Sequence, residues 1–531
     1  MSKPQMESHV SHGSIGEAPK RSTEFAPNYD FINSREITVK DYFGTLFVQF
    51  AKYRANQRIP RLDGLIETQR KIIWTAMTNN YTKKTSVGQV IADVKTSTNY
   101  HHGQDSIAST INNIIAPYKN NLQLLRPDGS FGSRTKREAA AYRYTETRLF
   151  PYIKLLFPIE DIIATKAYRV IDGKPAEPLT LLPLIPMGII NGNSQSGVGF
   201  STKLLPRDPL VIIDLLIDIL TGKTSTLPTY IPPKYPFFTG EVKLIDKNKW
   251  EMSGRISRIQ KGKKDPKEYI VVEEVPPSWS RAKLMANFDM LVENGIIESY
   301  NEECKGETFR TEVYAPNLNK LSDGKIIEKL GLTETETERF VYIASDEAID
   351  ENGNVIPGTS KDKFEIQCAN IAQYINYFIK KRIAIYEERR KYRMAKQYWE
   401  MQKIIAMINY INEVNAGRIE IRNKEEDEVV AQLSKYPENY LFIPMHDKFI
   451  WNEVEALGAK PTFNYLFDFK TRNFTPKALK RLNDQYNELY STFNDIQKET
   501  AAGLWYKDLV EFREIYVKFQ KDEAKKLAAL D

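Results

Sequence analysis

Hydrophobic residues in the first third of the chain recur at helical spacing. From Gly64 to Met77, one face carries apolar residues and two basic residues lie among them, namely Leu65, Ile72, Ile73 and Met77 with Arg70 and Lys71. The segment Gln104 to Ala116 has the same pattern, with Ile107, Ile111, Ile114 and Ile115 on one face and Pro117 as its stop. Short, closely spaced helices with charged turns predict a winged-helix domain over residues 35–180.

The pattern changes after Pro183 to alternating β-branched runs separated by turn residues, and this texture continues to about Pro357. Residues 240–245 and 269–275 are typical strands of this kind. We therefore expect a mixed α/β domain over residues 181–360. The acidic string that starts at Asp350 resembles the beginning of a calcium loop, but its later acidic ligands are missing, so an Asn-Gly turn is the better interpretation.

Long heptad patterns dominate the last third of the chain. No Pro or Gly occurs between Thr359 and Ala416, and apolar residues recur there at alternating steps of four and three, at Met394, Tyr398, Met401, Ile405 and Ile408. A second stretch opens with Thr475 as an expected N-cap and Pro476 at the first helical position, followed by Leu479, Leu482, Tyr486, Leu489, Phe493 and Ile496. The two predict a long antiparallel coiled coil within residues 361–515.

Aromatic and apolar residues between Tyr436 and Phe469, at the expected end of this coiled coil, leave two interpretations open. The coil is either a plain structural arm or an arm that ends in a dimer contact. Residues 516–531 are expected to form a charged C-terminal tail. With 531 residues, 41% of them hydrophobic, the chain is expected to form three or four domains, an α+β multidomain fold.

Charge and cysteine content restrict the class of protein further. The net charge is only +6, from 75 Lys and Arg against 69 Asp and Glu, so a polyanion site requires local clustering of basic residues. Cys304 and Cys368 lie far apart without metal-ligand spacing, which argues against disulfides and zinc and favours a reducing compartment. Residues 1–34 predict a disordered tail, and the lack of long apolar runs predicts a soluble protein.

The segment Gly129 to Leu149 carries the candidate chemistry, because small residues lead into Tyr144 with arginines on either side. Tyr142 and Tyr144 can be packing aromatics. Alternatively, Tyr144 attacks phosphorus, which requires a nearby cation because a phenol has a pKa of about 10. Guanidinium groups also stabilise the extra negative charge on an attacked phosphate, and the candidate cations are Arg134, Arg143 and Lys71.

Four linked motifs resemble the breakage-reunion subunits of type IIA DNA topoisomerases, the gyrase A and ParC type. They are Ala140 to Glu146, the Gly-Ser-Phe-Gly-Ser-Arg string at 129–134, Arg58 to Leu65 with Gln69-Arg70-Lys71, and Tyr100-His101-His102-Gly103. The resemblance runs from Ile37 to Ile515. The histidine pair without an intervening proline is more similar to eukaryotic topoisomerase II and to the medium subunit of T-even-phage topoisomerases, which favours a bacteriophage source and the host cytoplasm.

This resemblance implies a role for each matching residue. Tyr144 would form a 5′-phosphotyrosyl link to DNA, with Arg143 and His102 stabilising the transition state. His101 would contact phosphate rather than ligate metal, because adjacent histidines lack ligand spacing. The remaining DNA-binding residues would be Arg58, Arg70, Lys71, Arg134 and Ser196.

Two positions depart from the family pattern. Ser196 stands where relatives usually carry an isoleucine that wedges between base pairs, so either the DNA bend is driven otherwise or Val198 takes over. Ile66-Glu67 stands where relatives usually have Lys-Pro, which removes one phosphate contact.

The resemblance also implies partners, since no metal site is expected in this chain. Gly222-Lys-Thr lacks the first glycine of a nucleotide loop and follows a helix instead of preceding one. Mg²⁺ would be held mainly by a separate ATPase/toprim subunit that also uses ATP, in an A2B2-type complex with double-stranded DNA and no membrane association. The chain itself would be a homodimer through the end of the coiled coil, the C-gate.

Relaxation and decatenation are the expected reactions, because the chain stops at Asp531 before any DNA-wrapping propeller. The alternative function is a non-catalytic dimeric winged-helix architectural protein with Tyr144 buried. A tyrosine recombinase is disfavoured because Tyr144 lies early in the sequence, whereas that class has a late tyrosine with dispersed Arg and His.

Overall fold

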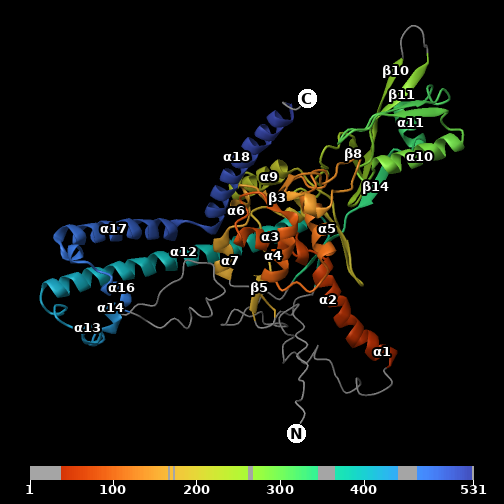
Figure 1. Ribbon diagram of the computed structural model, residues 1–531. Coiled ribbons are helices and arrows are strands. Elements are labelled where there is room, and N and C mark those ends of the chain that lie inside the picture. Colours follow the sequence, from red (N-terminus) through yellow and green to blue (C-terminus); the bar gives the residue numbers. More distant parts are fainter. Residues whose placement is uncertain are drawn as a thin grey trace.

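The computed structural model describes residues 38–165, 168–171, 174–260, 267–344, 365–440 and 463–528. A central body carries a two-helix arm on one side and a strand-rich projection on another, and α18 extends from the body at the C-terminal end (Figure 1). The expected tail 1–34, the Asn-Gly turn after Asp350 and part of the expected C-gate segment lie outside the described residues. Among the described residues, no helix is long and apolar enough to cross a membrane.

The N-terminal part of the body combines helices with one small antiparallel sheet whose strand order is β1-β3-β2. Its helices are α1 (Val39–Asp41), a π-helical turn η2 (Tyr42–Phe47), α2 (Val48–Arg58), α3 (Glu67–Thr78), α4 (Val87–Ser97) and α5 (Gln104–Ile115). Its strands are β1 (Thr85–Ser86), β2 (Leu125–Asp128) and β3 (Glu146–Leu149). These are the kinds of element that a winged-helix domain contains.

The helical periodicities of the sequence are confirmed in α3 and α5. Ile72 and Ile73 of α3 and Ile107, Ile111 and Ile115 of α5 are all fully buried. α5 ends at Ile115, two residues before Pro117, as that proline predicts.

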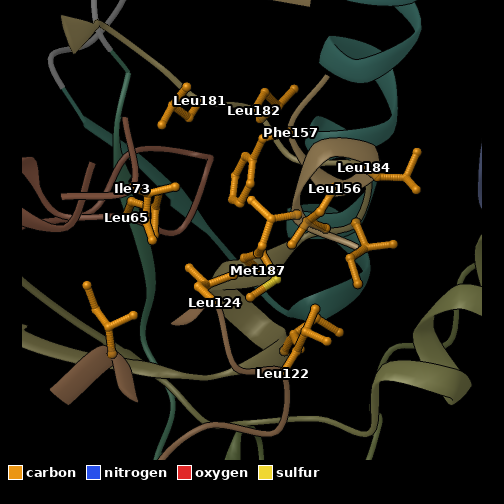
Figure 2. Close-up of a cluster of buried hydrophobic side chains, with 14 of the residues drawn as sticks. Leu65, Ile73, Leu122, Leu124, Leu156, Phe157, Leu181, Leu182, Leu184 and Met187 are labelled. Atoms are coloured by element: carbon orange, nitrogen blue, oxygen red, sulfur yellow. The ribbon is translucent and has the colours of Figure 1, made fainter. Parts of the chain in front are cut away.

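The main core is built from segments that are far apart in the sequence. Figure 2 shows side chains of this core that meet from the α3 region, the 122–124 segment, the end of α6 and the 181–187 segment. Gly64, with φ +77°, lies so close to Gly188 that a Cβ at Gly64 would be 2.2 Å from the Gly188 backbone nitrogen. Only glycine fits this contact.

The rest of the body contains short helices, three antiparallel strand pairs and two longer helices. These are α6 (Ile153–Leu156), α7 (Ile159–Thr165), β4 (Tyr168–Ile171), β5 (Lys174–Pro178), α8 (Met187–Ile190), β6 (Asn193–Ser196), β7 (Ser201–Leu204), α9 (Pro209–Leu220), β15 (Phe340–Ile343), β16 (Glu365–Cys368) and α18 (Ala501–Ala528). α18 runs through residue 515, and Tyr516 is buried. The boundary expected between 515 and 516 therefore falls within one helix.

The strand-rich projection spans residues 241–337, which is a part of the expected mixed domain of residues 181–360; other described elements in that range belong to the body. Its two sheets have the strand orders β10-β11-β13-β12 and β14-β9-β8, and all of their strand pairings are antiparallel. Its elements are β8 (Glu241–Asp246), β9 (Lys249–Ser253), β10 (Arg255–Gln260), β11 (Glu268–Glu274), α10 (Arg281–Glu293), β12 (Ser299–Glu302), β13 (Thr311–Tyr314), α11 (Asp323–Lys329) and β14 (Thr333–Thr337). It has a core of its own, which includes Phe288 and Val313.

The arm consists of α12 (Ile371–Asn415) and α17 (Pro476–Lys498), which lie side by side (Figure 1). At 1.5 Å per residue, the 45 residues of α12 span about 68 Å. The Thr475 side chain accepts a hydrogen bond from the Ala478 backbone nitrogen, with Pro476 in the first turn, so the predicted start of α17 is confirmed. Smaller elements close the far end, namely α13 (Glu426–Leu433), α14 (Pro437–Tyr440), α16 (Asn464–Phe467) and η4 (Thr471–Phe474).

The expected heptad seam of α12 requires correction. Tyr398 is 54% exposed, whereas Met401, Ile404 and Ile411 are buried. The buried stripe is therefore displaced from the Ile405 and Ile408 positions, which are only half-buried. The helix also begins at Ile371 because Asn370 caps it, and β16 occupies part of the stretch expected to be helical.

Candidate active site

Tyr144 lies on a tight turn at the surface of the body. The 3-10 turn η3 (Tyr142–Tyr144) precedes β3, and the Tyr144 backbone nitrogen donates to the Ala141 carbonyl oxygen over 2.9 Å. The Thr145 carbonyl oxygen then accepts from the Val87 nitrogen at 3.0 Å, which fixes the turn against α4. Tyr144 is 74% exposed. The interpretation of Tyr144 as a packing aromatic is therefore wrong, whereas the half-buried Tyr142 packs against the main core.

Arg143 places a positive charge beside the Tyr144 ring. Its guanidinium carbon lies 5.6 Å from the centre of that ring. The side chain is exposed, and no carboxylate among the described residues forms an ion pair with it. A guanidinium without a carboxylate partner can bind an incoming phosphate through paired hydrogen bonds.

The loop before Tyr144 is folded back on itself. The Ala140 nitrogen donates to the Ser130 carbonyl at 2.9 Å, and the Ser133 nitrogen donates to the Lys136 carbonyl at 2.7 Å. Gly132 has φ +83°, and a Cβ there would lie 2.9 Å from the Arg137 carbonyl oxygen. The small residues of the motif therefore allow a tight loop that holds the tyrosine turn in place.

His102 lies in the turn before α5 and contacts α2. Its Nε2 is 3.3 Å from Nε2 of Gln57, and its ring meets Tyr100 edge to face at 5.3 Å. Arg54 donates to Oε1 of Gln57 at 2.9 Å, which orients the amide so that its NH2 group donates to His102. In this arrangement Nε2 of His102 is the acceptor and the ring proton is on Nδ1.

Gln57 and Arg54 are site residues that the sequence interpretation missed. The available signal was their position in the last turns of α2, three residues apart and just before Arg58. Arg58 and His101 are both exposed in this region. The structure thus brings the Arg58 end of α2 to the histidine turn, while Tyr144 and Arg143 lie on a separate element beside α4.

Three expected DNA-contacting residues are instead buried in ion pairs. Arg70 donates to both carboxylate oxygens of Asp63, at 2.8 and 3.1 Å. Lys71 lies 2.7 Å from Glu177. All three cations, including Arg134, are at most 4% exposed. Direct phosphate contact is therefore not available to Arg70, Lys71 or Arg134 in this structure, because each already has a buried carboxylate partner and little solvent access.

Arg134 connects the body to the strand-rich projection. Its guanidinium forms two parallel hydrogen bonds with Glu274 of β11, at 3.0 and 2.6 Å, and donates to the Phe237 carbonyl at 3.1 Å. Glu274 also accepts from the nitrogen and the hydroxyl of Thr239. This bidentate pair anchors the loop that leads to Tyr144.

Ser196 lies near the tip of the β6–β7 hairpin, where it pairs with Ser201. Its side chain is exposed, and the tip is closed by a hydrogen bond from the Gly197 nitrogen to the Phe200 carbonyl at 2.7 Å. Val198 stands within this tip and is half-buried. Val198, the neighbour that the sequence suggested as a replacement wedge, has an apolar side chain, whereas Ser196 does not.

The described residues do not fit a metal site on their own. No group of three or more His, Cys, Asp or Glu side chains in the described part of the chain lies close enough together to hold an ion. The charged side chain beside the Tyr144 ring is the exposed cation Arg143. Tyr144 and Arg143 place an exposed phenol and a positive charge at this site.

Comparisons with known proteins agree with this chemistry. The sequence profile of the A subunits of DNA gyrase and topoisomerase IV matches residues 58–510. The chain is 26% identical over 490 residues to a putative mitochondrial DNA topoisomerase 2 of Caenorhabditis elegans, covering 90% of this chain and 40% of that protein. It is 25% identical over 509 residues to the mitochondrial DNA topoisomerase 2 of Dictyostelium discoideum, covering 93% and 36%. The chain thus spans well under half the length of these relatives.

The fold is also that of a solved structure. The DNA-binding, cleavage and re-ligation domain of Plasmodium falciparum topoisomerase II superimposes with a TM-score of 0.74 and 21% identity, over 92% of this chain and 66% of the other. The family profile covers most of the chain, including the Tyr144 turn, the histidine turn and the arm. The chain therefore belongs to the family formed by the A subunits of DNA gyrase and topoisomerase IV, the breakage-reunion part of type IIA DNA topoisomerases.

Proposed function

We propose that this chain breaks and rejoins duplex DNA through Tyr144, as part of an ATP-dependent type II topoisomerase. The observation that carries the proposal is the 74% exposure of Tyr144 on a turn fixed to α4, with the Arg143 guanidinium 5.6 Å from its ring. An exposed, pre-positioned phenol beside an unneutralised cation can act as a nucleophile on a phosphodiester.

The proposed reaction is a reversible exchange of one phosphodiester for another. The Tyr144 oxygen loses its proton and attacks phosphorus, a new O–P bond forms to the 5′ end of the cut strand, and the 3′ oxygen leaves and takes up a proton. Religation is the reverse step, in which the 3′ hydroxyl attacks and Tyr144 is released. The bond energy is kept in the phosphotyrosyl link, so resealing needs no nucleotide.

Further residues take supporting roles in this proposal. Arg143 and His102 hydrogen-bond the phosphate oxygens as negative charge develops on them. Arg58 and His101, both exposed beside the Gln57–His102 contact, bind the DNA backbone. Gln57 holds the His102 ring, so the loss of Gln57 should weaken cleavage without removing the nucleophile.

Metal and partner functions are assigned to other chains. The family uses Mg²⁺ and ATP, and bound Mg²⁺ neutralises charge on the attacked phosphate. Because the described residues do not fit a metal site on their own, we propose that a separate ATPase/toprim subunit holds Mg²⁺ and uses ATP, in an A2B2-type complex. The chain would be a homodimer through the far end of the arm, with relaxation and decatenation as the reactions. The histidine pair favours a bacteriophage source and the host cytoplasm.

Val198 is the proposed wedge for DNA bending. It is the apolar residue within the β6–β7 tip, while Ser196 at the expected position can only hydrogen-bond. Ser196 then contributes a polar contact to the DNA.

The proposal is tested with duplex substrates that carry a nick next to the cleavage site and a label on one side of it. With Mg²⁺ and its partner subunit, the chain should become linked only to the DNA fragment that carries the 5′ phosphate at the break, and not to the fragment that ends in the 3′ hydroxyl. Tyr144→Phe should abolish the adduct, while the matched control Tyr142→Phe should keep it. Binding without any adduct, in the presence of the partner, would instead favour a non-catalytic architectural protein.

A further inference from the structure

A cleft of about 350 Å³ lies between α5 and the loop that leads to Tyr144. Asp105, Asn112 and Asn113 of α5 form one wall, Tyr118 and Lys119 follow at the end of the helix, and Arg137 of the loop faces them. The Tyr118 hydroxyl donates to the Arg137 carbonyl at 3.1 Å, which ties the two walls together. The cleft is therefore a formed feature rather than a gap between independent segments.

Two cations face the cleft without a carboxylate partner. Nζ of Lys119 donates to the Asn113 side-chain oxygen at 2.6 Å, and the Arg137 guanidinium donates to the Pro277 and Trp279 carbonyls at 3.0 and 2.8 Å. Within the described residues, no carboxylate lies within 4.0 Å of either cation. Both charges flank the Tyr118 ring, at 5.6 and 5.8 Å from its centre. Arg134, three residues before Arg137, differs from these two cations because Glu274 neutralises its charge.

The electrostatics favour an anion at this end of the cleft. Partial burial, followed by the charge of Arg137, lowers the pKa of Lys119. Partial burial is also the main cause that lowers the pKa of Arg137. The charges of Tyr118 and Glu334 act in the opposite direction on Arg137, but burial outweighs them. The one carboxylate in the lining, Asp105, is eight residues before Asn113, about 12 Å away along the helix.

We infer that Lys119 and Arg137 hold a backbone phosphate of the DNA strand that runs towards Tyr144. This inference rests on the proposed function and adds two contact residues to it. Ala139 lines the cleft and stands five positions before Tyr144, so at about 3.4 Å per extended residue the two Cα atoms are at most about 17 Å apart.

The test is the salt dependence of DNA binding by the full chain with Lys119→Gln, Arg137→Gln and the double variant. Each phosphate contact contributes about 0.9 to the slope of log affinity against log salt. The double variant should therefore lose about 0.9 of that slope and bind about 8-fold more weakly at 0.1 M salt, and each single variant should lose a part of this slope. Lys435→Gln, an exposed lysine at the far end of the arm, is the matched control and should keep the wild-type slope.

Charge-preserving variants separate the phosphate contact from a structural role. Lys119→Arg and Arg137→Lys should keep the slope, although Arg137→Lys alters the hydrogen bonds to Pro277 and Trp279. An unchanged slope in the double variant overturns the inference. A second result would also overturn it. If inorganic phosphate raised the unfolding midpoint only when both cations were present, and the salt slope of DNA binding stayed constant in the variants, the cleft would bind free phosphate rather than DNA. Failure of the proposed function is recognised separately, by the absence of any covalent adduct in the wild-type chain.

Discussion

Replacing Arg134 by methionine should destabilise the protein strongly while leaving phosphate contacts unchanged. The guanidinium and its partner Glu274 are 4% and 3% exposed, so the variant leaves a carboxylate buried without its cation. Breaking a buried ion pair from one side costs about 3–5 kcal/mol. For a unit of 150–250 residues this lowers the unfolding midpoint by about 6–20 °C.

The double variant Arg134→Met/Glu274→Gln tests the cause of this loss. Glutamine removes the stranded charge but can still accept the hydrogen bond from the Thr239 nitrogen, which Glu274 receives at 2.9 Å. We expect the double variant to recover most of the loss, so the two substitutions should be non-additive by about 2 kcal/mol or more. Thermal unfolding followed by calorimetry measures the midpoints of all four proteins in the cycle.

The opposite outcome would refute the buried-pair interpretation. If Arg134→Met kept the wild-type midpoint but lost about 0.9 of the salt slope of DNA binding, Arg134 would be a phosphate contact after all. Additive effects in the cycle would likewise exclude direct coupling between the two side chains.

Three other predictions follow from the packing and the hairpin. Gly64→Ala should cost about 3 kcal/mol or more, measured as a fall in the unfolding midpoint, because the new Cβ meets the Gly188 backbone at a positive φ; a wild-type midpoint would disprove this close approach. Burial raises the pKa of the Cys368 thiol to about 12, so its thiolate appears only as the pH rises towards that value. Iodoacetamide at pH 8.5 should therefore label Cys368 about 1,000-fold more slowly in the folded chain than in the urea-unfolded chain. Equal labelling rates would contradict its burial. Val198→Ser should reduce DNA bending in an energy-transfer assay while Ser196→Ala should not, and the reverse order would reject the proposed wedge.

Sequence patterns correctly predicted those elements that depend on interactions between residues close together in the chain. The isoleucines of α5 and the Thr475 cap of α17 are confirmed because periodicity and capping depend on neighbouring residues. The α12 seam was displaced because several apolar positions compete there, and the partner helix rather than the heptad count decides which are buried. Tyr398 stays exposed, as the polar end of its side chain allows.

The cations of the candidate site show what the sequence could not supply. Lys71 and Arg134 pair with carboxylates 106 and 140 residues away, so only the folded chain distinguishes them from phosphate ligands. Tyr144 and Arg143 were predicted as a pair and do lie together at the surface. Lys119 and Arg137 carry no motif, and their relation to each other emerges only from the cleft that the fold creates.

The most direct test of the central proposal identifies the residue that carries DNA after cleavage. The chain is incubated with its partner subunit, DNA and Mg²⁺, then denatured, treated with nuclease and digested with trypsin. Because trypsin cuts after Arg143, Tyr142 and Tyr144 fall on separate peptides, residues 138–143 and 144–148. We predict a nucleotide adduct on the 144–148 peptide, whereas an adduct on the 138–143 peptide, or none on either, would contradict Tyr144 as the nucleophile.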